Sequence, residues 1–192
     1  KGSEKVSFFS IAYNLLSFTF NIENLPKSIV RLDLSCNKIK TVPSELFTSL
    51  PELKQLFIFQ NEIEELPDEV ATSSLTILNV SSNPLTSLPQ LPPTLNILCA
   101  QGCNFTEFPI TPSSMKKATS LTCIDFSNNK IETIPKTIEI DESEGEVKND
   151  DRIFLNKIEI FLLSCNKLTE FPEFSNSIRQ IDLSQNLIQN IS

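Results

Sequence analysis

One arrangement of hydrophobic and polar residues recurs along the chain. Apolar residues occupy positions 1, 4, 6 and 11 of a short frame, and asparagine occupies position 9. In one copy these residues are Leu75, Leu78, Val80, Leu85 and Asn83. Positions 4 and 6 share one face of an extended chain and positions 3, 5 and 7 share the other, which predicts a short strand. Eight copies in phase predict stacked units that share one continuous core.

Position 9 is an asparagine in every copy except one, which has a cysteine. This residue falls where the chain leaves the strand, and its amide can satisfy backbone groups that no strand or helix ladder reaches. A thiol does the same only weakly. The predicted structural ladder consists of Asn14, Asn37, Asn61, Asn83, Cys103, Asn129, Asn166 and Asn186.

An apolar residue followed by proline stands five and six residues beyond position 9 in six of the eight copies. Proline fixes φ and lacks an N–H, so its recurrence predicts turns and 3-10 segments with little α-helix on that side. One longer copy contains Thr111 to Ser120, where we expect a helical turn around Met115.

Another copy carries an acidic loop insertion at residues 136–152. Seven acids and one lysine give residues 139–151 a net charge of −6. A docking tail and a calcium loop are the functional alternatives, but the spacing does not match a calcium loop because Gly145 comes one place early. We interpret the insertion as a solvated loop.

The frame and the apolar-proline step resemble the leucine-rich repeat family over nearly the whole chain. The resemblance implies an α/β solenoid shaped like a horseshoe, with a concave parallel β-sheet of about eight short strands. We expect residues 1–192 to form a single domain of eight repeats. Neither end shows a polar capping element, so we expect the chain to be a fragment of a protein that continues past Ser192.

Positions 3, 5 and 7 of the frame line the concave face in this architecture, and such faces bind partners. A solvated face should not collect large apolar side chains, and contiguous exposed apolar surface marks an interaction site. The preference of strands for such side chains is the alternative explanation. The predicted partner-binding residues are Phe57, Phe59, Ile77, Ile97, Cys123, Asp125, Ile160 and Leu162.

Composition excludes most catalytic chemistry. The chain has no His and only three Gly, which excludes histidine-dependent triads and metal sites as well as glycine-rich phosphate loops. Its formal charge of −8 argues against nucleic acid, and no apolar stretch is long enough to span a membrane. Cys123 and Asp125 match the Cys-x-Asp signature of bacterial effector ubiquitin ligases, but both are outward strand positions here. We therefore expect no catalytic residue, cofactor or metal.

The five cysteines bear on the cellular compartment. Extracellular members of the family usually close their ends with paired cysteines, whereas all five cysteines here fall inside repeat frames. Their number is also odd, which favours a reducing compartment. We therefore expect a cytoplasmic protein, or alternatively a secreted effector that acts in a host cytosol.

These expectations combine into a non-catalytic protein–protein interaction module that binds a protein or peptide, in intracellular signalling. The Leu-Pro step is similar to that of repeat proteins that scaffold Ras-type signalling. One alternative is the regulatory or targeting part of a multidomain enzyme, such as a Ser/Thr phosphatase, an adenylate cyclase, a kinase or an effector ubiquitin ligase. The second alternative is an extracellular receptor-type repeat protein.

Overall fold

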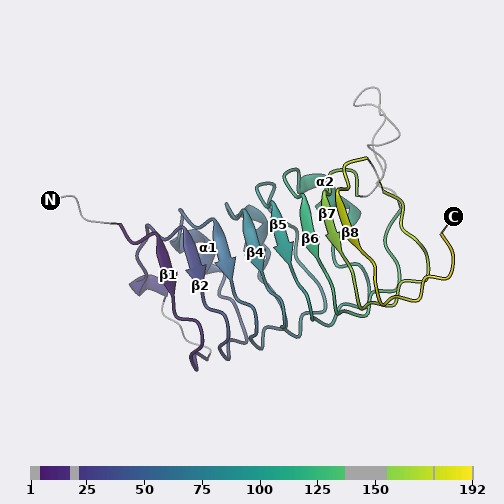
Figure 1. Ribbon diagram of the computed structural model, residues 1–192. Helices are drawn as coiled ribbons and strands as arrows, with labels where there is room; N and C mark the ends of the chain where they lie inside the picture. Colours follow the sequence, from purple (N-terminus) through teal and green to yellow (C-terminus); the bar gives the residue numbers. More distant parts are fainter. Residues whose placement is uncertain (1–4, 18–21, 137–154, 175, 192) are drawn as a thin grey trace, which may run out of the picture.

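Eight parallel strands lie side by side in one open sheet, in the order in which they occur along the chain (Figure 1). The computed structural model describes residues 5–17, 22–136, 155–174 and 176–191. Each strand has three residues and occupies frame positions 3, 4 and 5. The strands are β1 (Phe8–Ser10), β2 (Arg31–Asp33), β3 (Gln55–Phe57), β4 (Ile77–Asn79), β5 (Ile97–Cys99), β6 (Cys123–Asp125), β7 (Ile160–Leu162) and β8 (Gln180–Asp182).

The register of the sheet brings equivalent frame positions together. Position 4 of each strand pairs with position 4 of the next, so that Leu78 lies between Leu56 and Leu98. The position 4 side chains of β2 to β7 are fully buried, whereas Ile181 of β8 is 37% exposed because no described strand follows it. Each repeat therefore buries its apolar side chains mainly against its neighbours, as the eight-copy frame predicts, and the solenoid is confirmed.

The convex side consists mostly of extended chain and turns. The described residues include two short α-helices, α1 (Glu45–Ser49) and α2 (Pro112–Lys117), and two 3-10 segments, η1 (Ile22–Asn24) and η2 (Asp68–Thr72). Figure 1 shows these segments on one side of the sheet, across the core from its open face. The prediction of little α-helix is confirmed.

Helix α2 forms where the longer copy predicts a helical turn. Pro112 starts the helix, where its missing N–H costs nothing, and the Oγ1 of Thr111 accepts a hydrogen bond from the Ser114 N–H at 3.2 Å. Lys116 and Lys117 fall in the last turn, where a positive charge favours the helix dipole. Met115 is buried and anchors the helix to the core, which confirms the predicted turn.

A column of left-handed residues follows the strands and was not predicted from the sequence. The residue directly before each ladder position has a φ between 52° and 64° in all eight repeats, although only Gly102 is a glycine. The left-handed region costs a residue with a Cβ roughly 1–2 kcal/mol, so the ladder contacts must offset this strain in seven repeats. The column consists of Tyr13, Cys36, Gln60, Ser82, Gly102, Asn128, Cys165 and Gln185.

The predicted acidic insertion lies outside the described residues, except for its first residue. The Nζ of Lys136 forms an ion pair with Glu170 at 3.0 Å, and this contact raises the pKa of the lysine. Both side chains are largely exposed, so the pair contributes little to stability. The division of residues 1–192 into eight repeats and one insertion stays a prediction for the undescribed segment.

Candidate functional site: the concave face

The position 9 side chains join each repeat to the one before it. Asn83 is typical: its Nδ2 donates to the carbonyls of Ile58, Val80 and Ser81 at 3.0, 2.8 and 3.3 Å. Its Oδ1 accepts from the N–H of Ile63 in the preceding repeat at 3.0 Å. The same pattern of bonds is made by Asn37, Asn61, Asn129, Asn166 and Asn186. These amides hold the strand exits in place and thereby fix where the concave side chains stand.

Two members of the ladder differ from this pattern. Asn14 belongs to the first repeat and donates to Ile11 and Ala12 of its own repeat, at 3.1 and 3.0 Å. Cys103 donates from its Sγ to the carbonyls of Val80 and Gln101, at 3.6 and 4.0 Å. A thiol has no oxygen to accept a backbone N–H, so this step of the ladder is the weakest chemically.

The register places the predicted apolar residues of position 3 in one line across four strands. We call Ile77, Ile97, Cys123 and Ile160 the apolar row; they pair in register through β4, β5, β6 and β7. All four are half-buried, and Gln55 and Gln180 stand at the two ends of the row. The row therefore offers a continuous apolar strip with polar limits, which is the layout of a binding surface.

The other predicted residues lie beside this row. Leu162 and Asp125 are paired in register at position 5 of β7 and β6, and Phe57 has the same position in β3. Phe59 follows at position 7, and it is half-buried like the others. The structure thus brings six residues together over β4 to β7 and sets Phe57 and Phe59 next to them on the edge nearer the amino terminus. Their role in binding stays a prediction.

Arg31 takes part in this face and was missed from the sequence. Its guanidinium lies 4.4 Å from the ring centre of Phe57 and 5.2 Å from that of Phe8. A cation stacked on aromatic rings is attracted by about 0.5–1 kcal/mol per ring at an exposed site. Phe57 is therefore partly covered by Arg31, and a partner meets a mixed aromatic and cationic surface at this end. Position 3 of β1 and β2 together with position 5 of β3, compared across the register, would have been the signal.

The aspartates of position 5 have a structural task as well. The Oδ1 atoms of Asp33, Asp125 and Asp182 accept hydrogen bonds from the N–H groups two residues later, at 3.0, 3.0 and 2.9 Å. Asn79 makes the same bond to Ser81 at 3.1 Å. These short turns end the strands and orient the side chains. The hydrogen bonds with Ser184 lower the pKa of Asp182, which keeps this carboxyl ionised.

The five cysteines are all free, and burial affects the thiols of three of them. Burial raises the pKa of the Cys99 thiol from 9.0 to about 11, with a further contribution from the Asp125 carboxylate. Burial likewise raises the pKa of Cys103 to about 11 and raises that of Cys123. Cys36 and Cys165 donate to the amide oxygens of Gln60 and Gln185, at 2.8 and 3.0 Å.

We expect Cys99 to react with iodoacetamide at pH 8 at least ten-fold more slowly in the folded protein than in urea. A pKa of about 11 leaves roughly 0.1% of the thiol as thiolate at this pH. Because folding raises this pKa above 9.0, the associated stability is present below pH 9 and lost as the pH rises through about 11. Peptide mass spectrometry over a pH series measures this, and equal rates in both states would contradict it.

Metal binding and membrane spanning are two further possibilities for the described part of the chain. Within it, no group of three or more His, Cys, Asp and Glu side chains is placed to hold a metal ion. Within the same residues, no helix has the length and apolar character that crossing a membrane requires.

Comparison with protein families agrees with this geometry. A family model described as "Leucine rich repeat" matches residues 27–85, and a second, "Leucine Rich Repeat", matches residues 120–139. The chain is a leucine-rich repeat protein. The sequence-based resemblance is confirmed, and the family supports a protein-interaction module as the general class of function.

Two curated leucine-rich repeat proteins are similar in sequence. Mimecan of Homo sapiens is 32% identical over 113 residues, which cover 58% of this chain and 38% of mimecan. Keratocan of Danio rerio is 27% identical over 175 residues, which cover 88% of this chain and 46% of keratocan. The chain thus spans less than half the length of either relative. Both relatives are non-catalytic repeat proteins.

Solved structures of leucine-rich repeat proteins share the fold. The structure of a complex of TLR13 with ssRNA13 has a TM-score of 0.70 and 21% identity, and covers 94% of this chain and 25% of that one. The plant peptide hormone receptor RGFR1, solved in complex with RGF2, has a TM-score of 0.62 and 24% identity. That match covers 91% of this leucine-rich repeat chain and 27% of the receptor.

The expectation of a cytoplasmic location is wrong. Mimecan and keratocan are secreted proteins of the extracellular matrix, and the structural neighbours include extracellular receptors. The expectation depended on unpaired cysteines, which were taken as a sign of a reducing compartment. Burial raises the pKa of Cys99 and Cys103, which disfavours their reactive thiolate forms, so free thiols do not by themselves indicate such a compartment. Because the predicted role in signalling was intracellular, that part of the prediction is wrong together with the cytoplasmic location.

Proposed function

We propose that this leucine-rich repeat protein is an extracellular module that binds a protein or peptide partner on its concave face. The apolar row is the observation that carries the proposal. Its four side chains line up through β4 to β7 and continue to Leu162 and, beyond β4, to the aromatic pair Phe57 and Phe59. Half-buried isoleucines on a rigid sheet lose little side-chain entropy on binding, so their further burial stabilises a complex.

A protein partner fits this face better than a nucleic acid. The solved neighbour in complex with ssRNA13 is a repeat protein with an RNA ligand, so the fold itself accepts either class. Here, frame positions 3, 5 and 7 carry three aspartates and a single basic residue, Arg31. Phosphate backbones are bound through clustered lysine and arginine, whereas this face opposes their charge.

The enzyme-linked alternative requires a catalytic domain in another part of a longer protein. On the concave face, burial and the nearby Asp125 carboxylate raise the pKa of the Cys123 thiol, which disfavours a nucleophilic role, and the relatives are non-catalytic. The extracellular alternative agrees with the relatives and the protected thiols, and it is therefore the form of binding module that we adopt.

Replacing Ile97 by aspartate is expected to weaken capture of the natural partner at least ten-fold. Ile97 lies inside the apolar row, where a carboxylate must be desolvated, and central contacts usually dominate interface energy. Capture is measured from extracellular extracts of the source, with immobilised Ile97→Asp and Phe57→Asp variants beside the original protein. Circular dichroism and thermal melting confirm that each variant folds.

The matched control is Glu107→Lys, a charge change on the exposed convex side, which is expected to leave capture unchanged. If the concave variants fold and capture the partner as well as the original protein does, strand propensity alone explains the apolar residues and the proposal fails.

A further inference from the structure

The concave face carries a second line of side chains next to the apolar row. Position 5 holds Asp33 in β2, Asp125 in β6 and Asp182 in β8, which we call the aspartate row. The other charged residue at frame positions 3, 5 and 7 is Arg31, which is stacked on Phe8 and Phe57. Toward the carboxyl end of the sheet, the charge on these positions is therefore purely negative.

The turns beyond the strands need the oxygen of these side chains but not the charge. Asn79 in β4 accepts the same bond from Ser81 that Asp125 accepts from Ser127 and Asp182 from Ser184. A carboxylate has about four lone-pair positions, and the turn bond uses one of them. The Asp182 carboxylate also accepts from the Ser184 and Ser164 hydroxyls, and these bonds lower its pKa. The carboxylates are thus oriented by the protein and, with accepting capacity left, favour a cationic group.

The two rows have a spacing that a polypeptide can follow. Positions 3 and 5 lie about 7 Å apart along a strand, and Asp125 and Asp182 lie two strands apart, or about 10 Å. A segment that crosses the strands in the extended polyproline II form advances about 3.1 Å per residue with three residues per turn, so side chains three residues apart lie about 9 Å apart on the same side. Such a segment can direct two basic side chains to the aspartate row and the side chains between them to the apolar row.

We propose that the partner presents an extended segment whose apolar side chains contact the apolar row and whose two basic side chains, about three residues apart, pair with Asp125 and Asp182. This proposal depends on concave-face binding as proposed above and specifies the chemistry of the partner. Because an apolar strip lies beside oriented carboxylates, the face favours such a segment over a purely apolar or an acidic one.

The test uses a library of random twelve-residue peptides displayed on phage and selected on the immobilised protein. We expect selected peptides to share apolar residues and a pair of Lys or Arg about three residues apart. A selected peptide, synthesised with a fluorescent label, is then titrated against the original protein and the Asp125→Asn, Asp182→Asn double variant. Because Asn79 shows that asparagine keeps the turn bond, this variant should fold and melt like the original.

The double variant is expected to bind the labelled peptide at least ten-fold more weakly, and the difference should shrink as the salt concentration rises. The matched control is the double variant Asp68→Asn, Glu132→Gln, which removes the same charge from exposed positions outside the concave face and should leave binding unchanged. Replacing the two basic residues of the peptide by Gln should abolish the difference between the original protein and the concave variant.

Two failures can be told apart. If selected peptides lose binding to Ile77→Asp and Ile97→Asp but carry no basic pair and bind the asparagine variant unchanged, the basic segment is wrong while concave binding stands. If no peptide is selected, or selected peptides bind the Ile77→Asp and Ile97→Asp variants unchanged, concave binding is wrong as well.

Discussion

Replacing Phe161 by alanine is expected to destabilise the protein by about 4 kcal/mol, the typical cost of removing a buried phenylalanine. Phe161 fills position 4 of β7 and is fully buried. Its ring centre lies 6.1 Å from that of Phe108 and 6.1 Å from that of Phe174. The alanine variant would lose these contacts and leave a cavity between repeats that the stacked backbone cannot close.

Chemical denaturation followed by circular dichroism measures this loss. The matched control is Leu162→Ala at the next position, where the half-buried side chain faces the concave surface. We expect the control to cost less than half as much, since less apolar area is lost from the core. Equal losses for the two variants would contradict the assignment of the two faces of β7.

Replacing Asn83 by alanine is expected to cost about 2 kcal/mol or more. The variant leaves the Ile63 N–H without its side-chain partner and removes one of two side-chain donors from each of the carbonyls of Ile58 and Val80. Each buried polar group left unpaired costs about 1–3 kcal/mol, although some relaxation reduces the sum. The left-handed residue before Asn83, Ser82, would also lose the contacts that hold it in a strained conformation.

The chain offers the reverse substitution at Cys103. An asparagine there supplies the missing oxygen and replaces long thiol bonds by amide bonds, so Cys103→Asn is expected to stabilise the protein by about 1 kcal/mol. Thermal melting measures both changes: Asn83→Ala should melt at a lower temperature than the original protein, and Cys103→Asn at a higher one. If Asn83→Ala melts like the original protein, or if Cys103→Asn is destabilising, the ladder does not have the energetic role assigned to it.

The fold could be predicted because one physical requirement is repeated eight times. The apolar positions of Leu78 and Val80 recur in every repeat and the asparagine of Asn83 in seven of eight, and each copy independently indicates a strand, a buried face and a strand exit. A helical turn at Met115 could be predicted because this repeat is longer than most, and its extra residues need local structure of their own. A wrong interpretation of one repeat therefore does not change the predicted architecture.

Other features could not be predicted because residue type does not determine them. The left-handed column contains Tyr13, Gln60 and Ser82, which have no common chemistry, so the strain comes from the stacked backbone rather than from local preference. The contact between Arg31 and Phe57 joins residues of different repeats and depends on the register. Burial raises the pKa of Cys99 and Cys103 and is not determined by residue type, so the number of cysteines does not determine the compartment.

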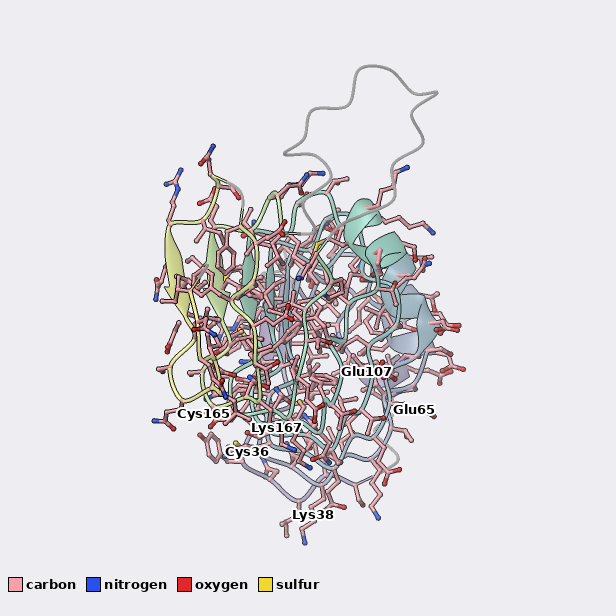
Figure 2. The ribbon with its side chains drawn as sticks, turned by 90° about the vertical axis from the view of Figure 1, so that its right-hand side faces the viewer. Cys36, Lys38, Glu65, Glu107, Cys165 and Lys167 are labelled. Carbon is pink, nitrogen blue, oxygen red and sulfur yellow. The ribbon has the colours of Figure 1, made fainter. Side chains whose placement is uncertain are left out.

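The central claim, that partners bind the concave face, is tested most directly by site-specific photo-crosslinking. Cross-linkable p-benzoylphenylalanine replaces Gln55 or Gln101, which border the apolar residues, or replaces Glu65 or Glu107 on the opposite side. Figure 2 shows Glu65 and Glu107 across the core from the strands. With partner-containing extract, we predict an adduct of the same mass from positions 55 and 101 and none from 65 and 107. Adducts from 65 and 107 alone would contradict the account.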